Sequence, residues 1–184
     1  MFNYLSYFLS ALFVVFITIL SWFIINIKKY RDWFGGIKIM ERKIVHVVGT
    51  GTIGEPLIGI LCEQKSNLGI DEVTFHKQSP LTKDAPKIKN LIAKGARLAV
   101  HEDRVGSFKE IGLEPEFTME EAVSRSSVVI DCTPKGFGHQ NKADFYEKYI
   151  DKVKGFLAQG SEDGFGKKYA RGINDHVINS EDQF

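Results

Sequence analysis

From Lys43 onward, apolar residues alternate between short continuous runs and runs with helical spacing. The continuous runs predict buried strands over residues 43–48, 72–76, 98–100, 114–117, 127–131 and 155–158. The helical spacing predicts helices over residues 53–64, 85–94, 118–124 and 143–149. Thr118-Met-Glu-Glu121 has the form of a capping box that opens the third of these helices. Strands that alternate with helices are typical of βαβ units, so we predict an α/β domain with a doubly wound, mostly parallel sheet.

The first 27 residues have a different pattern, because they contain no charged side chain. The run from Phe8 to Ile27 is interrupted only by two serines, a threonine and an asparagine. Twenty helical residues span about 30 Å, the thickness of the hydrocarbon core of a bilayer. Basic residues follow the run at once, so the positive-inside tendency places its C-terminal side in the cytoplasm. We therefore interpret residues 1–27 as a transmembrane helix, residues 28–42 as a basic linker, and residues 43–184 as the globular domain.

Two other interpretations of this N-terminal run stay open. A cleaved signal peptide is disfavoured, because no basic region precedes the run and the positive charges come after it. The other alternative is that Met40 is the true start. The sequence from that residue, MERKIVHVVGTGTIG, would open a domain without an anchor.

Composition limits the classes of function. The chain is 43% hydrophobic and 26% charged, as globular proteins are. Its net charge of +1 gives no general attraction to polyanions, so no nucleic-acid partner is expected. Cys62 and Cys132 are far apart, lack metal-ligand spacing and lie among apolar residues. This pattern favours free thiols in a reducing compartment, and no metal site.

A glycine-rich loop connects the first predicted strand to the first predicted helix. Its sequence, Gly49-Thr50-Gly51-Thr52-Ile53-Gly54, has the spacing G-x-G-x-x-G. In dinucleotide-binding folds the first glycine permits a tight turn, the second lets the backbone approach a pyrophosphate, and the third lets helix and strand pack closely. The free N–H groups of the helix N-terminus favour a phosphate there. The loop predicts a Rossmann-type dinucleotide site; the alternative is a structural turn that binds nothing. Glu55 would repel a pyrophosphate unless it points away.

The end of the second predicted strand bears on the choice of cofactor. NAD-selective sites carry an acid about twenty residues beyond the third glycine, where it accepts hydrogen bonds from the ribose. Here the strand ends Val73-Thr74-Phe75-His76-Lys77, without an acid. Thr74, His76 and Lys77 offer groups that can receive a 2′-phosphate, so we predict that NADP binds at least as readily as NAD. The alternative is that His76 and Lys77 belong to an ordinary solvated loop.

Two motifs further along resemble one family. Asp131-Cys-Thr-Pro-Lys-Gly-Phe-Gly-His-Gln-Asn141 is similar to the D-x-T-P-x-G-x-G-x-x-N segment of archaeal-type (type II) glyceraldehyde-3-phosphate dehydrogenases. Ala158-Gln-Gly-Ser-Glu162 is similar to a segment that tends to read Q-G-G-E in that family. The likeness runs from about Lys43 to about Glu162. It implies the NAD(P)-binding domain of an oxidoreductase that oxidises an aldehyde in glycolysis or gluconeogenesis.

The resemblance also implies which residues contact the cofactor. It assigns the pyrophosphate to Gly49, Gly51, Thr52, Ile53 and Gly54. It places Lys77 and its neighbours on the adenosine side, and Thr133 and Gly160 near the nicotinamide. The alternative for Thr133 is a simple strand terminator. Full-length members of the family suggest a homo-oligomer, assembled largely through their catalytic half.

The catalytic cysteine that the resemblance implies has no counterpart in this chain. The family's chemistry begins with a thiolate that attacks the aldehyde, from a Ser-Cys-Asn-Thr motif that these 184 residues do not contain. One alignment of the tail places Asp175 at the nucleophile's position; in the other, the tail is an insertion and the chain stops before the motif. Cys62 is interpreted as packing. Cys132 has only His139 nearby as a base, so we predict no catalytic residue.

Three functions follow from these expectations. The first is the NAD(P)-binding domain of a glyceraldehyde-3-phosphate dehydrogenase-like enzyme, truncated before its catalytic cysteine and inactive alone. The second is a membrane-tethered dinucleotide-binding module that does no chemistry. The third is a relative of aspartate-semialdehyde or homoserine dehydrogenases, which the Asp131–Asn141 motif disfavours.

Overall fold

A computed structural model of the chain describes residues 16, 18–22, 26, 42–159 and 162–184. The chain divides into two units, Met1–Glu41 and Arg42–Phe184. In the first unit the described residues are helical. The transmembrane helix predicted within residues 1–27 lies mostly outside the described residues, and so does nearly all of the predicted linker. Among the residues that are described, no helix has the length and apolar character needed to cross a membrane.

The second unit is built around one sheet of six strands, all paired in parallel. The strands are β1 (Ile44–Val48), β2 (Glu72–His76), β3 (Ala96–Val100), β4 (Phe117–Thr118), β5 (Val128–Asp131) and β6 (Gly155–Ala158). Their order across the sheet is β4-β3-β2-β1-β5-β6. The chain therefore builds outward from β1 to β4, returns to the other side of β1, and builds outward again through β5 and β6. This is the doubly wound arrangement that the sequence predicted.

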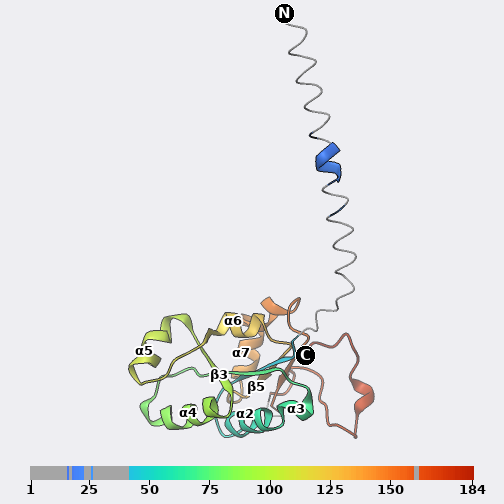
Figure 1. Cartoon of the computed structure of the whole chain (residues 1–184). Helices are drawn as coiled ribbons and strands as arrows, with labels where there is room; N and C mark the ends of the chain where they lie inside the picture. The colour runs from blue at the N-terminus through green and yellow to red at the C-terminus, as the bar shows by residue number, and fades with distance from the viewer. Residues whose placement is uncertain (1–15, 17, 23–25, 27–41, 160–161) are drawn as a thin grey trace, which may run out of the picture. The chain divides into compact units, whose positions relative to one another are not determined.

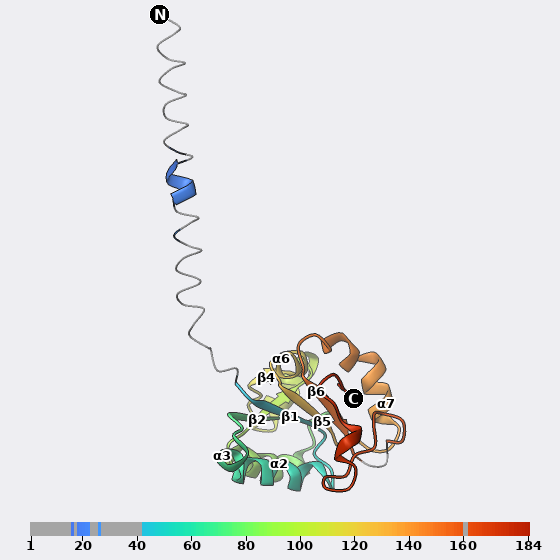
Figure 2. The ribbon, with the colours of Figure 1, turned by 90° about the vertical axis from the view of Figure 1, so that its right-hand side faces the viewer.

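Helices cover both faces of the sheet. Figures 1 and 2 show α2 along one face and α6 and α7 on the other, and Figure 1 shows α4 beside α2. The α-helices of this unit are α2 (Gly54–Glu63), α3 (Lys65–Leu68), α4 (Ala85–Ala93), α5 (Val105–Glu110), α6 (Met119–Ser124) and α7 (Phe137–Asp144). The 3₁₀ turns among the described residues of this unit are η1 (Thr82–Asp84), η2 (Glu102–Arg104), η3 (Tyr146–Tyr149) and η4 (Asp175–Val177).

The apolar core has two parts, one on each face of the sheet. Val47 of β1 faces the first cluster, together with Ile58 of α2 and Ile88 of α4. Val48, the next residue along, belongs to the second cluster, which includes Tyr146. Successive strand residues point to opposite faces, and a doubly wound sheet is covered on both. The apolar side chains of β1 can therefore pack against a core on either face. Each fully buried aliphatic side chain stabilises the fold by about 1.5–3 kcal/mol.

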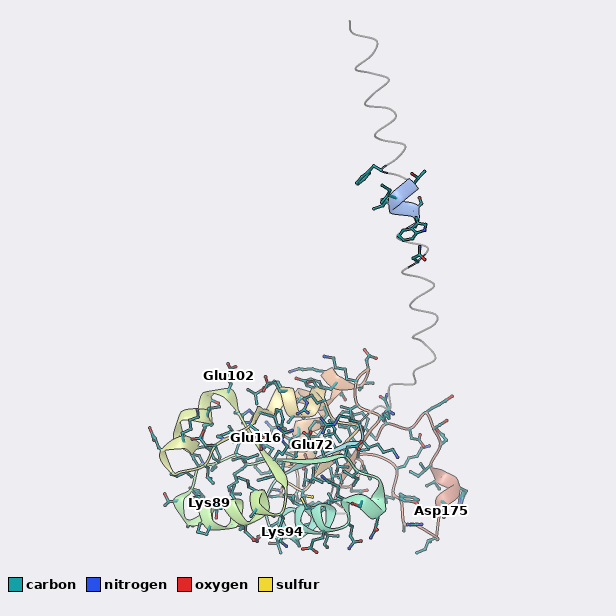
Figure 3. All side chains as sticks on the ribbon, viewed as in Figure 1. Glu72, Lys89, Lys94, Glu102, Glu116 and Asp175 are labelled. Carbon is teal, nitrogen blue, oxygen red and sulfur yellow. The ribbon has the colours of Figure 1, made fainter. Side chains whose placement is uncertain are left out.

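A buried carboxylate joins β2, β3 and α6 at the amino end of the strands. Glu72 is only 4% exposed, and Arg42, Arg97 and Arg125 each place a guanidinium nitrogen 3.0–3.2 Å from its carboxylate oxygens. Arg97 and Arg125 also lie over the ring of Phe117, at 4.6 and 4.2 Å from its centre. Figure 3 marks Glu72. Such pairing offsets the cost of burying the charge of Glu72. The cluster lies at the amino ends of the strands, opposite to the end that carries the glycine loop.

The predicted capping box of α6 is confirmed, and one predicted helix is wrong. Thr118 Oγ1 accepts the Glu121 backbone N–H at 3.1 Å, and the Glu121 carboxylate accepts the Thr118 N–H at 2.9 Å. The helix predicted over residues 143–149 instead begins at Phe137 and ends at Asp144, and a separate 3₁₀ turn follows it. The reason is not local, because the start of α7 is held by a carboxylate from beyond β6, as described below.

The C-terminal tail lies along β6. The backbone N–H of Phe156 donates to the carbonyl of Gln183 at 2.6 Å, and the ring of Phe184 stacks on that of Phe156 at 5.0 Å. Figure 2 shows the C-terminus close to β6. The tail has weak periodicity and no element was predicted there, yet it covers part of the free edge of the sheet, which would otherwise expose unpaired backbone groups.

Candidate functional site

The glycine loop lies where the strand order reverses. It follows β1 directly, and β1 is flanked by β2 on one side and β5 on the other. The Gly49 N–H donates to the His76 carbonyl at the end of β2 at 3.3 Å, and the Cys132 N–H donates to the Val48 carbonyl at 2.8 Å. Open parallel sheets bind their ligands beyond the carboxyl ends of the strands at such a reversal. The structure thus places the loop where a ligand of this fold is expected.

The three glycines of the loop have different surroundings. Gly49 has a φ of +96°, which side-chain-bearing residues rarely adopt. A Cβ atom on Gly54 would lie 2.0 Å from the carbonyl oxygen of Gly49, so only glycine lets α2 pack this closely on the loop. A Cβ on Gly51 would meet no atom within 4 Å. The fold therefore requires the first and third glycines, whereas the second faces open space.

The N-terminus of α2 is not capped by the protein's own side chains. Its N-cap residue is Ile53, no side chain accepts a hydrogen bond from its first turn, and Thr52 and Ile53 are exposed. Within the described ranges, no acceptor binds the backbone N–H groups of Gly51, Thr52 or Ile53. Donors at a helix N-terminus, with the partial positive charge of the helix behind them, suit an anionic group.

Glu55 does not oppose an anion at this helix end. Its carboxylate lies 3.0 Å from Lys87 Nζ of α4, which also lies 3.5 Å from the carbonyl oxygen of Thr50. The negative charge of Glu55 is therefore drawn toward α4 and balanced there. Lys87 also connects α4 to the glycine loop, a link that the sequence did not reveal.

A cavity of about 300 Å³ lies elsewhere, between α2 and α4. It is lined by Glu55, Pro56, Gly59, Ile60, Glu63, Asn90, Leu91 and Lys94. Its two carboxylates already pair with lysines, Glu55 with Lys87 and Glu63 with Lys94. The lining offers neither uncapped backbone donors nor an approach to the ends of the strands, so we place the candidate site at the loop and not in this cavity.

On the β2 side of the loop, Thr74 lies in the interior of the strand. It is fully buried, and its Oγ1 lies 2.7 Å from Nδ1 of His46 on β1. His46 is fully buried as well, and burial lowers its pKa to about 3. The structure therefore does not bring Thr74 to the end of the strand. Its hydroxyl joins β1 to β2 through a neutral imidazole.

His76 and Lys77, by contrast, stand at the end of β2. His76 is 4% exposed, its ring meets that of His101 edge-on at 4.8 Å, and burial lowers its pKa to about 3. Lys77 Nζ lies 2.7 Å from Oδ2 of Asp84, which belongs to η1. The hydrogen bond that Lys77 donates lowers the pKa of the Asp84 carboxyl more than any other interaction does. Lys77 is thus not a free solvated side chain.

On the β5 side, Asp131 gathers the residues of the D-x-T-P motif. Its carboxylate is fully buried; one oxygen accepts from the Thr133 N–H at 2.8 Å and from the Thr133 hydroxyl. The other oxygen accepts from Asn141 Nδ2 at 2.8 Å and from the Tyr146 hydroxyl at 2.6 Å. Burial and the adjacent Asp131 raise the pKa of Tyr146, which keeps its hydroxyl protonated as a donor. This network fixes Thr133 at the end of β5.

Glu162 holds the next part of the same segment. Its side chain is 1% exposed, and one carboxylate oxygen accepts the Gly136 N–H at 2.6 Å, at the start of α7. A Cβ on Gly138 would lie 2.9 Å from Cγ of Glu162, so the motif's second glycine makes room for this carboxylate. The predicted nicotinamide-side residue Gly160 lies outside the described residues.

Neither cysteine has the surroundings of a nucleophile. Cys132 is buried, and burial followed by the charge of Asp131 raises its pKa to about 11. Burial also raises the pKa of Cys62. Asp175, which one alignment placed at the nucleophile's position, lies on the exposed turn η4 (Figure 3), where it accepts hydrogen bonds from Tyr169 and Gly172. A thiol with a raised pKa is a poor nucleophile at neutral pH.

Sequence reasoning missed several residues that shape this region. Asp131 and Asn141 were visible in the motif, but their mutual hydrogen bond was not. Asp84, Lys87 and Tyr146 carried no signal at all. They come from η1, α4 and η3, and their roles arise only where these elements meet the loop or the end of β5.

Comparison with known proteins confirms the resemblance seen in the motifs. The chain is similar to the glyceraldehyde-3-phosphate dehydrogenases of Pyrobaculum islandicum, 29% identical over 121 residues, and of Pyrobaculum arsenaticum, 33% identical over 121 residues. Each match covers 65% of this chain and 32% of the relative. The enzyme of Methanopyrus kandleri is 46% identical over 74 residues, 38% of this chain and 20% of that protein. No family model matches the chain. The chain thus spans about a third or less of the length of these curated relatives.

Proposed function

We propose that residues 43–184 form the NAD(P)-binding domain of a glyceraldehyde-3-phosphate dehydrogenase-like oxidoreductase. The observation that carries the proposal is the uncapped N-terminus of α2, next to a glycine loop at the reversal of strand order. The similarity to archaeal glyceraldehyde-3-phosphate dehydrogenases supports it. A pyrophosphate needs backbone donors and room for close approach, and the loop offers both at Gly51.

In this proposal each group of predicted residues contacts a different part of the dinucleotide. Gly49, Gly51, Thr52, Ile53 and Gly54 hold the pyrophosphate. His76 and Lys77 lie on the adenosine side, whereas the hydroxyl of Thr74 is held inside the sheet by His46. Thr133, and Gly160 after β6, approach the nicotinamide, which accepts or gives a hydride when bound. Without an acid at the end of β2, NADP binds at least as readily as NAD.

We further propose that these residues alone oxidise no aldehyde. The sequence contains no Ser-Cys-Asn-Thr motif, and the Cys132 thiol has a raised pKa. The residues shown here therefore bind and orient the dinucleotide, while a nucleophile has to come from outside them. We expect dinucleotides to bind to these residues with a Kd no tighter than about 1 μM.

The decisive experiment places a carboxylate where the pyrophosphate should lie. Gly51→Asp adds a side chain in open space, so the fold should persist while repulsion weakens NADP binding by at least about tenfold. Gly106→Asp is the matched control, because a Cβ on Gly106 also meets nothing within 4 Å and α5 lies away from the loop. Calorimetric titration of the full chain and both variants tests this. Equal affinities in all three would contradict the proposal.

A second candidate is favoured by the uncharged run at residues 8–27. In that case the protein is a membrane-tethered dinucleotide-binding module without chemistry. It should then sediment with membranes after alkaline washing, while a chain that starts at Met40 stays in the supernatant. Recovery of the full chain in the supernatant would refute the tether.

A further inference from the structure

The acid that is missing from the end of β2 is supplied from another element. Asp84, in the 3₁₀ turn before α4, places Oδ2 2.7 Å from Nζ of Lys77, which directly follows β2. The side chain of Asp84 is 20% exposed and that of Lys77 is 14% exposed, so the pair is largely buried but still accessible to solvent. In the sequence, Asp84 comes thirty residues after Gly54. That distance is too long for the spacing of about twenty that marks an NAD-selective strand end.

The pair lies beside the glycine loop. Lys77 follows His76, whose carbonyl accepts the Gly49 N–H at 3.3 Å. Asp84 is the N-cap residue of α4, and Lys87 of that helix reaches the Thr50 carbonyl at 3.5 Å. The start of α4 is therefore tied to the same loop as the end of β2. A dinucleotide with its pyrophosphate on α2 places its adenosine ribose at this end of the strand.

The two charges suit the two forms of that ribose. The 2′-hydroxyl of NAD is a donor, and a carboxylate is the strongest acceptor that a side chain offers it. The 2′-phosphate of NADP is a dianion at neutral pH, and it prefers an ammonium group. A lone acid would exclude the phosphate, and a lone lysine would favour it. One group of each sign, 2.7 Å apart, can serve either form.

We propose that the Lys77–Asp84 ion pair contacts the adenosine ribose and allows this site to bind both NAD and NADP. With NAD, Asp84 accepts from the ribose hydroxyls while Lys77 stays on the carboxylate. With NADP, Lys77 turns to the 2′-phosphate and offsets the charge of Asp84. The inference rests on the proposed dinucleotide binding, and it adds Asp84, from η1, as a residue that determines specificity.

The test compares two single substitutions in the full chain by calorimetric titration with NAD and with NADP. Asp84→Asn removes the acceptor charge and releases Lys77, so the ratio of the NAD Kd to the NADP Kd should rise about tenfold. Lys77→Gln removes the ammonium group that pairs with Asp84, so the same ratio should fall about tenfold. The opposite signs matter, because a merely structural pair would shift both affinities together.

Lys94→Gln is the matched control. It breaks a lysine–carboxylate contact of similar length, 2.8 Å from Lys94 Nζ to Glu63 Oε1, at the far ends of α2 and α4 from the loop. The Kd ratio should not change in this variant, and thermal unfolding monitors the fold of all three. Ratios within twofold of wild type in both Asp84→Asn and Lys77→Gln would overturn the inference alone. Wild-type protein that binds neither cofactor would overturn the proposed function, and the inference with it.

Discussion

The two sides of the glycine loop are held in place by different means. On the β2 side, aliphatic residues of neighbouring strands and of α2 and α4 pack in one cluster, and the loop takes its shape from Gly49 and Gly54. On the β5 side, two buried carboxylates, Asp131 and Glu162, hold the segment between β5 and α7. Aromatic residues of η3, β6 and the tail fill the space beneath it.

The difference shows where each side is vulnerable. A glycine loop that is held by its backbone geometry fails where a new atom meets the main chain. A hydrogen-bonded network fails when one buried acceptor is lost, because each remaining donor is then left without a partner. Substitutions in the two regions should therefore differ in both size and mechanism.

The largest effect is expected at Gly54. Gly54→Ala puts a Cβ 2.0 Å from the Gly49 carbonyl, and because backbone cannot rotate away as a side chain does, we expect a loss of more than about 3 kcal/mol in the free energy of unfolding. Gly51→Ala, with no atom within 4 Å, should change that free energy by less than about 0.5 kcal/mol. Urea denaturation of both variants measures the contrast. Equal stabilities would mean that the loop is not held by close packing.

The next effect tests the network on the β5 side. Asp131→Ala removes the acceptor for Thr133, Asn141 and Tyr146, and should cost about 3 kcal/mol in unfolding free energy. Tyr146→Phe removes one donor and leaves the acceptor satisfied by others, so it should cost only about 1 kcal/mol. Denaturation curves of the two variants give the comparison. If Tyr146→Phe were as damaging as Asp131→Ala, the single hydrogen bond from Tyr146, and not the shared set of bonds to the carboxylate, would hold this side.

The smallest effect depends on pH and concerns the β2 side. His46 and His76 have pKa values lowered to about 3 by burial, so the folded state holds them neutral while the unfolded chain protonates them near 6.5. Their contribution to stability is complete above pH 6.5 and is lost as the pH falls toward 3. At pH 5 the partial loss of each histidine's contribution should lower the free energy of unfolding by about 2 kcal/mol.

Urea denaturation at pH 7.5 and at pH 5 measures this loss. His46→Asn should lose less stability between the two pH values than wild type does, by about 2 kcal/mol. The control is His176→Gln, at an exposed position of the tail, which should keep the wild-type difference. An unchanged difference in His46→Asn would show that this histidine is not held neutral.

Much of the fold could be read from local pattern. The strand predicted at residues 72–76 is β2 to the residue, and the helix after the glycine loop was predicted to within one residue at each end. These elements are amphipathic or continuously apolar, and their local preferences agree with their place in the sheet. α7 was misplaced because its sequence, FGHQNKAD, has no apolar stripe, and because its N-terminus is fixed by Glu162, more than twenty residues later.

The sequence by itself determined the parallel α/β arrangement, the glycine loop and the likeness to a dehydrogenase, because each depends on residues close together in the chain. Only the tertiary structure decided that Thr74 is an interior residue, that Glu55 is neutralised by Lys87, and that Asp84 stands beside Lys77. Each of those facts is a contact between different elements. The energy of such a contact depends on burial and distance, which no spacing along the chain encodes.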